Sequence, residues 1–444
     1  MTKRLTHAQA VVKRARDEIE KRSGKTPEEL YAEREKRLAD VIALKVPDRV
    51  PVLVRFGRFP LRYAGLPQSA MFYNPAAYQE SLIRCLVEFD PDAFQGNFQN
   101  TSGRALEKIG PKQFAWPGGT LRDDQDDQFL DAEIMKGEEY DLFISSPDDF
   151  ILRYYLPRAF EALAPLAKLP PVQALVRYSN IVSPTARFTA PEMLQAFEAL
   201  FKTWQEQGKY DRMNNKFGNI GEVVGIPPFT YRNSALDFGG NVGIPPFDLF
   251  ASYLRGMRGV MIDMFKRPGK LLTACDKLLE WQLARMTPVD PKKRRTAAGA
   301  NHFMSEEFLS RKQFDTFVWP TWKKYILATI DLGYTPVPYM EGKSDDRIEH
   351  FLELPKGKAL IGFEKIDMAR AKSILGGHLC IYGGVPSSLL WGGSPQDVEE
   401  YCKDIIKVCG KSGGLILSST TQMDNVKPEN IKAMVDAAKK YGRY

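Results

Sequence analysis

Two glutamates end apolar segments in the C-terminal half of the chain, where a buried strand would not normally carry a charge. Glu341 ends PVPYME and Glu364 ends ALIGFE. If the two strands are neighbours, their carboxylates approach each other, and two acids in a partly desolvated site raise the pKa of at least one of them. A carboxyl group that stays protonated near neutral pH can serve as a general acid, so we expect Glu341 to donate a proton, with Glu364 beside it. In the alternative, both form ion pairs, Glu341 with Lys343 or Arg347 and Glu364 with Lys365.

His302 is a third candidate for chemistry. It follows the small-residue run AAGAN, where a strand should end, and the chain has only four histidines. With Glu341 and Glu364 it could supply nitrogen and oxygen ligands to zinc or another divalent metal and leave one position open. A hydrogen-bonded structural histidine is the alternative. Tyr339, two residues before Glu341, joins these three as a catalytic candidate.

A second group of residues at predicted strand ends is placed to hold a substrate. Arg55 and Arg58 can anchor a carboxylate in bidentate fashion. Gly384 lies in a glycine-rich turn that lets a flat ligand approach the backbone closely, although such turns more often only connect a strand to a helix. The remaining members of this substrate-binding group are Asn97, Tyr178, Asn180 and Ser419.

These residues can converge only if the strands that carry them run parallel. From residue 297 onwards, strand-like and helix-like segments alternate at short spacing, a pattern typical of parallel strands joined by right-handed crossovers. Earlier strand candidates at residues 49–57, 92–98 and 174–182 raise the count to about eight. We therefore predict an α/β fold, a (β/α)8 TIM barrel over residues 44–444, with the candidate residues at the C-terminal ends of its strands. An open doubly wound sheet is the alternative, but no GxGxxG motif follows the first strand.

Two further segments depart from this regular pattern. Residues 1–43 are rich in Ala, Glu, Lys and Arg and contain TPEE, a helix start with Thr as N-cap. We predict a helical arm that either lies on a second subunit of a homodimer or covers the bottom of the barrel. Residues 211–248 are crowded with Gly, Asn and Pro and contain the hexapeptide VGIPPF twice. Long insertions of this kind are often lids or binding loops, so we predict a lid or a subunit contact there.

Composition excludes several classes of protein. The 444 residues are 43% hydrophobic and 26% charged, as in ordinary globular proteins, and the net charge of +7 includes no Lys/Arg block dense enough for nucleic acid. Five scattered cysteines form neither a CxxC motif nor a Cys/His cluster, so no disulfide framework or thiolate zinc site is expected. No signal peptide and no apolar run long enough to cross a membrane are found. We predict a cytoplasmic protein without nucleic-acid or membrane partners.

The C-terminal segments resemble the closing strands of the uroporphyrinogen decarboxylase superfamily. The resemblance is carried by GGVPSSLLWGGSPQDVEEYCKDIIKVCGKSGGLILSSTT and PENIKAMVDAAKKYG, and it extends back through KALIGFEKIDMARAKSILG. In outline it covers residues 44–444. It implies a (β/α)8 barrel with its site at the C-terminal strand ends. The superfamily also includes cobalamin-linked methyltransferases, so the fold alone leaves the chemistry open.

Two differences from the superfamily's sequence patterns reduce the number of reactions that we expect of this chain. The first strand reads PVLVRFGRFPLRYAG in place of the decarboxylase's arginine-rich stretch, and GGVPSSLLW replaces the residues that follow that enzyme's seventh strand, so a porphyrinogen substrate is not expected. Zinc thiol-methyltransferases of the superfamily place a His and a Cys two apart at the fifth strand end and another Cys after the eighth. The matching positions here are Tyr339 and Glu341, then Ser419 and Thr420. Activation of a thiol on zinc would therefore lack its usual thiolate ligands.

The resemblance implies a corrinoid-dependent methyltransferase component, closer to the cobalamin-linked branch than to the true decarboxylase. We expect an O-demethylase that moves a methyl group from a small methoxylated substrate to a separate corrinoid protein. No cobalamin-binding signature is present in the chain, so no cofactor is expected to bind it tightly and cobalamin would arrive with that partner. The alternatives are a decarboxylase or lyase acting on a small carboxylated substrate, and a non-catalytic barrel subunit of a complex.

Overall fold

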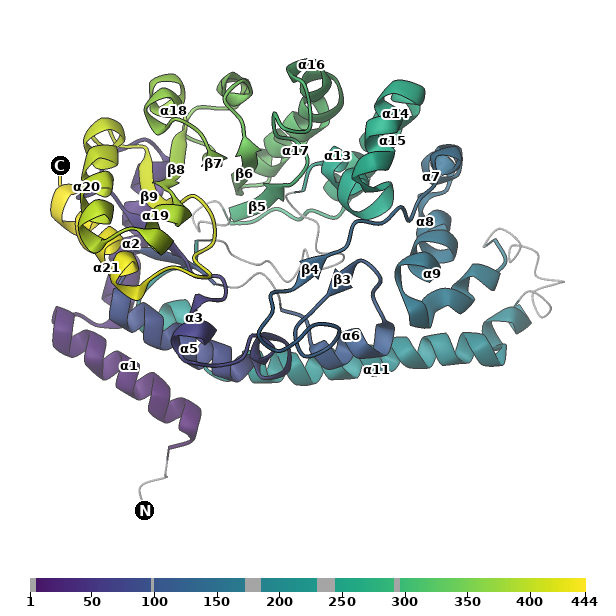
Figure 1. Ribbon diagram of the computed structural model, residues 1–444, viewed down its shortest axis with the longest axis horizontal. Helices are drawn as coiled ribbons and strands as arrows, with labels where there is room; N and C mark the ends of the chain where they lie inside the picture. The colour runs from purple at the N-terminus through teal and green to yellow at the C-terminus, as the bar shows by residue number, and fades with distance from the viewer. Residues whose placement is uncertain (1–4, 97–99, 172–184, 230–243, 291–295) are drawn as a thin grey trace.

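A parallel sheet of seven strands, in the order β2-β1-β9-β8-β7-β6-β5, forms the centre of the molecule (Figure 1). The computed structural model describes residues 5–96, 100–171, 185–229, 244–290 and 296–444. The sheet curls because the first strand of the chain pairs with the last, Leu53 lying opposite Ser418. This α/β fold with a curled parallel sheet is consistent with a TIM-like barrel. The strands are β1 (Val52–Arg55), β2 (Ala93–Gln95), β5 (Thr296–Asn301), β6 (Thr335–Lys343), β7 (Leu360–Lys365), β8 (Cys380–Val385) and β9 (Leu415–Ser419).

The first copy of VGIPPF lies between β2 and β5, the two edges of the sheet. The amide of Phe94 donates to Pro227 O at 3.3 Å, and the amide of Phe229 donates to Phe94 O at 2.7 Å. On the other edge, Thr296 Oγ1 donates to Phe229 O at 3.2 Å. Residues 227–229 therefore occupy the place of a third barrel strand. The strand that we predicted there, residues 174–182, lies outside the described residues.

Side chains alternate between the barrel interior and the surrounding helices, as the two-residue period of a strand requires. In β1, Leu53 packs in an interior cluster while Val52 and Val54 pack outwards. The interior cluster also contains Ala93, Phe229, Val337, Tyr339, Leu360, Cys380, Tyr382 and Ile416. Phe229, which is 1% exposed, fills the interior on the side where the described residues form no regular strand.

Amphipathic helices cover the outside of the sheet. In α21 (Pro428–Tyr441) the buried residues Ile431, Met434, Val435 and Ala438 follow helical spacing, so one face packs inwards. The helices α17 (Trp319–Asp331), α18 (Met368–Leu375), α20 (Pro395–Ile405) and α21 follow their strands in chain order and arch over them in Figure 1. Further helices are α3 (Phe59–Tyr63), α4 (Ala70–Tyr73), α5 (Pro75–Phe89), α12 (Ile220–Val224), α13 (Pro246–Leu249), α14 (Gly256–Lys266), α15 (Pro268–Ala284), α16 (Arg311–Gln313) and α19 (Ser387–Gly392).

The N-terminal arm consists of α1 (His7–Ser23) and α2 (Pro27–Ile42). Thr26 and Glu29 form a reciprocal capping box at the start of α2, as TPEE predicted. Leu38 and Val41 of α2 are fully buried in the interior cluster, together with Ala93, Leu360 and Cys380 from the starts of β2, β7 and β8. Of the two positions predicted for the arm, α2 therefore takes the one at the bottom of the barrel.

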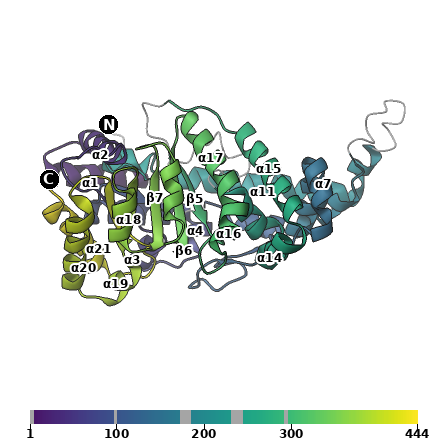
Figure 2. The ribbon, with the colours of Figure 1, turned by 90° about the horizontal axis from the view of Figure 1, so that it is seen from above.

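Residues 100–171 and 185–214 extend the molecule sideways from the sheet (Figure 1). A short antiparallel pair, β3 (Phe114–Ala115) and β4 (Gln128–Phe129), follows α6 (Gly103–Ile109). The helices α7 (Tyr140–Ser145), α8 (Pro147–Phe150) and α9 (Leu156–Ala159) and the far end of α11 (Pro191–Asn214) lie opposite the C-terminal helices (Figure 2). No helix in the described part of the chain is long and apolar enough to span a membrane.

Candidate active site

Arg55 is the buried cation of the barrel mouth. It lies two residues beyond Leu53 on β1, so the alternation of the strand turns its side chain inwards, where it is 5% exposed. Its Nε donates to Gln95 Oε1 at 2.9 Å, and one terminal nitrogen donates to Thr420 O at 2.9 Å. The guanidinium lies 4.4 Å from the ring centroid of Tyr339. Among the described residues no carboxylate is within ion-pairing distance of Arg55, so the mouth holds a cation that an anionic ligand could neutralise.

Glu341 lies in the same mouth and forms no hydrogen bond or ion pair within the described part of the chain. The alternative ion pairs do not form, because Lys343 pairs with Glu306 and Arg347 pairs with Asp346. Burial raises the pKa of Glu341, while the positive charge of nearby His302 opposes the rise. The carboxyl group is thus biased towards its protonated form, as a general acid requires.

Glu364 approaches Glu341 across the β6–β7 pair. The register of this pair shifts between Met340 and Lys343, and Gly342 has a φ of 68°, a left-handed conformation suited to glycine. The amide of Gly342 consequently donates to Glu364 Oε2 at 2.8 Å. The charge of Glu364 contributes to the raised pKa of Glu341, so the two predicted acids interact electrostatically. Lys365, the ion-pair partner considered for Glu364, pairs with Glu307 at 3.6 Å instead.

His302 is held by Asp248, a candidate site residue that sequence reasoning missed. The carboxylate of Asp248 is 0% exposed, and its Oδ2 lies 2.9 Å from His302 Nδ1. It also accepts hydrogen bonds from the amides of His302 and Phe303, at 3.3 and 3.2 Å. Burial alone would lower the pKa of His302, but Asp248 raises it to about 9. The imidazole is therefore charged at neutral pH, with Nε2 free of hydrogen bonds to any described residue.

Tyr339 closes the ring of contacts around Arg55. Its hydroxyl donates to Thr420 O, the same carbonyl that accepts from Arg55. Burial raises the pKa of Tyr339, so the phenol stays neutral near pH 7. Its placement suits positioning of Arg55 as well as contact with a ligand.

Three other predicted substrate-binding residues, Arg58, Ser419 and Gly384, do not share the surroundings of Arg55. Arg58 pairs with the carboxylates of Asp127, Asp126 and Asp424, so its charge is already balanced. Ser419 Oγ donates to Thr421 O at 2.6 Å, and the strand parity puts the neighbouring Ser418 on the inward side instead.

Gly384 has a φ of 100°, and a Cβ built there would meet Met368 and Ile405 of the helical layer at 3.4 Å. It lines a cavity of about 400 Å³ together with Glu364, Ser387 and Thr420, at the C-terminal ends of β7 to β9. Asn97, Tyr178 and Asn180 lie outside the described residues.

The predicted metal site gains no support from the described residues, in which no three His, Cys, Asp or Glu side chains are grouped as ligands. His302 Nδ1 is engaged by Asp248 and Glu364 accepts from a backbone amide. The cysteines are all buried, and Cys380 lies at the start of β8, at the end of the barrel remote from the mouth. We therefore assign no step to a metal.

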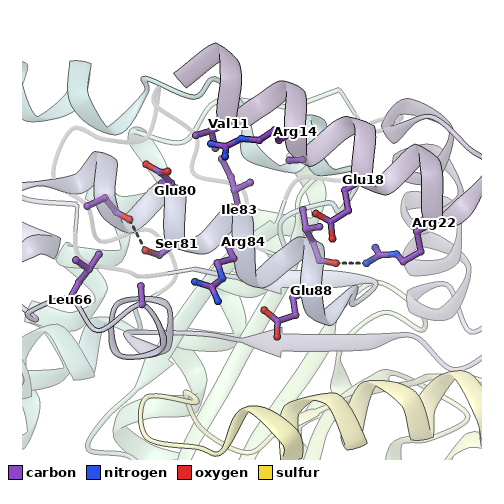
Figure 3. A pocket seen from close by; sticks show the side chains of 14 residues that line it. Val11, Arg14, Glu18, Arg22, Leu66, Glu80, Ser81, Ile83, Arg84 and Glu88 are labelled. Carbon is purple, nitrogen blue, oxygen red and sulfur yellow. Dashed lines mark hydrogen bonds between the residues drawn. The ribbon is translucent and has the colours of Figure 1, made fainter. Parts of the chain in front are cut away.

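A larger hollow of about 850 Å³ lies on the surface between α1 and α5, away from the barrel mouth. Figure 3 shows Arg14, Glu18 and Arg22 of α1 facing Glu80, Arg84 and Glu88 of α5 across it. Several of these groups are engaged elsewhere: Arg22 pairs with Asp90, Glu80 with His7, and Glu88 accepts from Tyr63. The hollow between α1 and α5 contains none of the candidate residues at the strand ends.

Comparisons with known proteins relate the chain to one family and to one solved structure. Residues 231–441 match the family described as Uroporphyrinogen decarboxylase (URO-D). In structure, the chain is similar to a methyltransferase from Methanosarcina mazei, with a TM-score of 0.55 and 14% sequence identity over 92% of this chain and 98% of the other. At that identity the likeness shows a shared fold alone. No curated protein matches the chain in sequence.

The matched segment contains Asp248, His302, Glu341 and Glu364, and the structural likeness extends over almost the whole chain. The resemblance drawn from the closing strands is thus confirmed for residues 231–441, the part of the chain that matches the uroporphyrinogen decarboxylase family.

Proposed function

We propose that this protein is a methyltransferase component, an O-demethylase that transfers a methyl group from a small methoxylated substrate to a corrinoid carried by a separate protein. The family match over residues 231–441 and the similarity in fold to a methanogen methyltransferase support an enzyme of this class. The barrel mouth would receive both the substrate and the corrinoid partner.

The observation that carries the proposal is the convergence of two protonatable groups, His302 and Glu341, beside the unpaired cation Arg55. Cleavage of a methyl ether leaves an alkoxide or phenoxide, which is a poor leaving group unless it is protonated as the bond breaks. His302 carries a proton at neutral pH, and its Nε2 is free to donate it. The raised pKa of Glu341 makes it a second proton reservoir for the same site.

Each of these residues then has its own role in the reaction. Arg55 anchors a carboxylate of the substrate, and Tyr339 keeps Arg55 in place. His302 donates its Nε2 proton to the ether oxygen as the C–O bond breaks, and the bonding electron pair stays on that oxygen. Glu341 then passes its proton to His302 and regains one from water, and the charge of Glu364 helps to keep the pKa of Glu341 raised. A reduced corrinoid brought by the partner would supply the electron pair for the new bond to the methyl carbon.

The same observations concern the division of the chain into an N-terminal arm and a barrel unit. We propose that residues 44–444 form one barrel unit with residues 1–43 as its N-terminal arm. Residues 211–248 then do more than form a lid, because Phe229 fills the barrel and Asp248 holds His302.

The experiment is to incubate the protein with a Co(I) corrinoid protein and a panel of methoxylated acids, and to follow methylation of the corrinoid by its absorbance. Substrate-dependent methylation supports the proposal. Absence of methylation across the panel, with CO2 released from a carboxylic acid, would instead establish the second candidate, a decarboxylase. Arg55 favours that candidate as well, since a buried guanidinium holds any carboxylated substrate.

A further inference from the structure

A cavity of about 480 Å³ lies beside the mouth, between the β3–β4 pair and the residues that follow β5. Pockets of this size hold small organic ligands. His302 forms part of its wall, so the cavity and the mouth share one side chain. No residue predicted from the sequence other than His302 belongs to it.

Aromatic side chains dominate the cavity wall. Its aromatic members are Phe114, Phe129, Tyr155, Phe160, Tyr253 and Phe303. They come from segments far apart in the sequence: Phe114 and Phe129 from the β3–β4 pair, Phe160 from the end of α9 and Phe303 from the turn after β5. Most of them are half-buried, and Phe129 remains 43% exposed, so part of their surface stays open to the cavity although several also pack on neighbouring rings. Aromatic walls of this kind gain most from a flat ring that can stack or pack edge to face.

The charged groups of the cavity restrict its ligand further. Asp127 lines the wall, but its carboxylate is engaged by Arg58. His302 is the cationic group of this wall. Asp248 fixes its ring through the contact with Nδ1. The hydroxyls of Tyr155 and Tyr253 form no hydrogen bonds within the described residues. The cavity therefore offers apolar faces with a single cationic donor at one end, which suits an aromatic ring carrying an oxygen acceptor.

We propose that this cavity is an aryl subsite, which binds the ring of an aromatic methyl ether with its oxygen directed at His302. The inference rests on the proposed function and names the substrate class of the same site. Aliphatic methyl ethers would bind in the mouth without filling this cavity.

Binding measurements test the subsite without requiring turnover. The probes are 3-methoxybenzoate, its saturated analogue 3-methoxycyclohexanecarboxylate, and methoxyacetate, titrated calorimetrically into the wild-type chain. We expect 3-methoxybenzoate to bind at least about tenfold more tightly than either other probe, because only the flat ring matches the aromatic wall. Equal affinities of the aromatic and saturated probes would overturn the proposal, and this comparison needs no variant.

Two variants and a matched control locate the binding. Phe303→Ala and the milder Phe160→Leu should each weaken 3-methoxybenzoate binding by about tenfold and leave methoxyacetate binding unchanged. Phe265→Ala, which removes a side chain 78% exposed on α14, should have no effect. Wild-type affinity in Phe160→Leu and in a folded Phe303→Ala would place the ring elsewhere. Ring binding without methyl transfer would contradict the proposed function alone, and methyl transfer from methoxyacetate without ring selectivity would contradict the subsite alone.

Discussion

Asp248 Oδ2 lies 2.9 Å from His302 Nδ1, and the same carboxylate accepts hydrogen bonds from the amides of His302 and Phe303. This arrangement fixes the imidazole ring and directs Nε2 away from Asp248. Because Asp248 is fully buried, its negative charge acts on His302 with little screening and keeps the ring protonated. An acid of this kind, placed beside Arg55 and Glu341, is the basis for the proposed chemistry.

Asp248→Asn should change the pH dependence of the reaction. The pKa of His302 is raised from 6.5 to about 9, so activity that needs the protonated ring persists up to that pH and is lost as pH rises through it. Without the carboxylate, burial remains and the pKa should fall to its ordinary value of 6.5 or below. The basic limb of the kcat/KM profile should therefore move to lower pH by roughly two units or more. Asp276→Asn, at an exposed position, serves as the control, and an unchanged basic limb in Asp248→Asn would remove Asp248 from this role.

Glu341→Gln should lower kcat with little change in KM. The substitution keeps the shape of the side chain but removes its proton, and loss of a general acid or base costs about 10²- to 10⁴-fold in rate. Glu364→Gln should have a smaller effect, because Glu364 acts through the pKa of Glu341. Steady-state kinetics of both variants test this order. If Glu341→Gln were fully active, Glu341 would have no place in the proton path.

Arg55→Lys should raise KM for a carboxylated substrate by about ten- to a hundredfold, since the ammonium keeps the charge but loses the planar fork. For a neutral methyl ether KM should change little. Arg58→Lys is the matched control, because Arg58 is engaged by three carboxylates and should affect stability more than KM. Equal KM changes in the two variants would argue against Arg55 as the anchor.

Phe229→Ala should destabilise the fold by about 3–5 kcal/mol, the cost typical of truncating a fully buried phenylalanine. Phe229 fills the barrel interior where residues 227–229 bridge β2 and β5, and its ring lies 5.0 Å from that of Tyr382. The free energy of unfolding from denaturant titration measures the loss, with Phe265→Ala as the exposed control. A change below about 1 kcal/mol would mean that the interior repacks without this side chain.

The strands that carry Glu341 and Glu364 could be predicted because continuous apolar runs between glycine and proline are typical of buried parallel strands. Residues 227–229 could not, because they form no regular strand and join the sheet edges through only a few hydrogen bonds. The sequence pattern also left open which of Ser418 and Ser419 faces the interior, and the structure turns Ser418 inwards, in line with Ile416. A one-residue error in strand parity exchanges the interior and exterior faces.

Asp248 was missed because nothing local identifies it. It lies 54 residues before His302, in a segment whose composition suggested a lid, and only the fold brings the two together. The residue type carried some signal, since the acid directly after the apolar IPPF lies in the first turn of α13 (Pro246–Leu249), but its burial could not be foreseen.

The most direct test of the account is the leaving-group dependence of methyl transfer, measured in the wild type and in His302→Asn. The donors are a series of methoxybenzoates whose phenols differ in acidity, and the readout is methylation of a Co(I) corrinoid protein. If His302 protonates the departing oxygen, the variant should lose about 10²- to 10⁴-fold in rate for the least acidic phenols and much less for the most acidic ones. A loss of the same size for every donor would contradict the proton-donor role of His302, and a wild-type protein that methylates no corrinoid with any donor would contradict the proposed function.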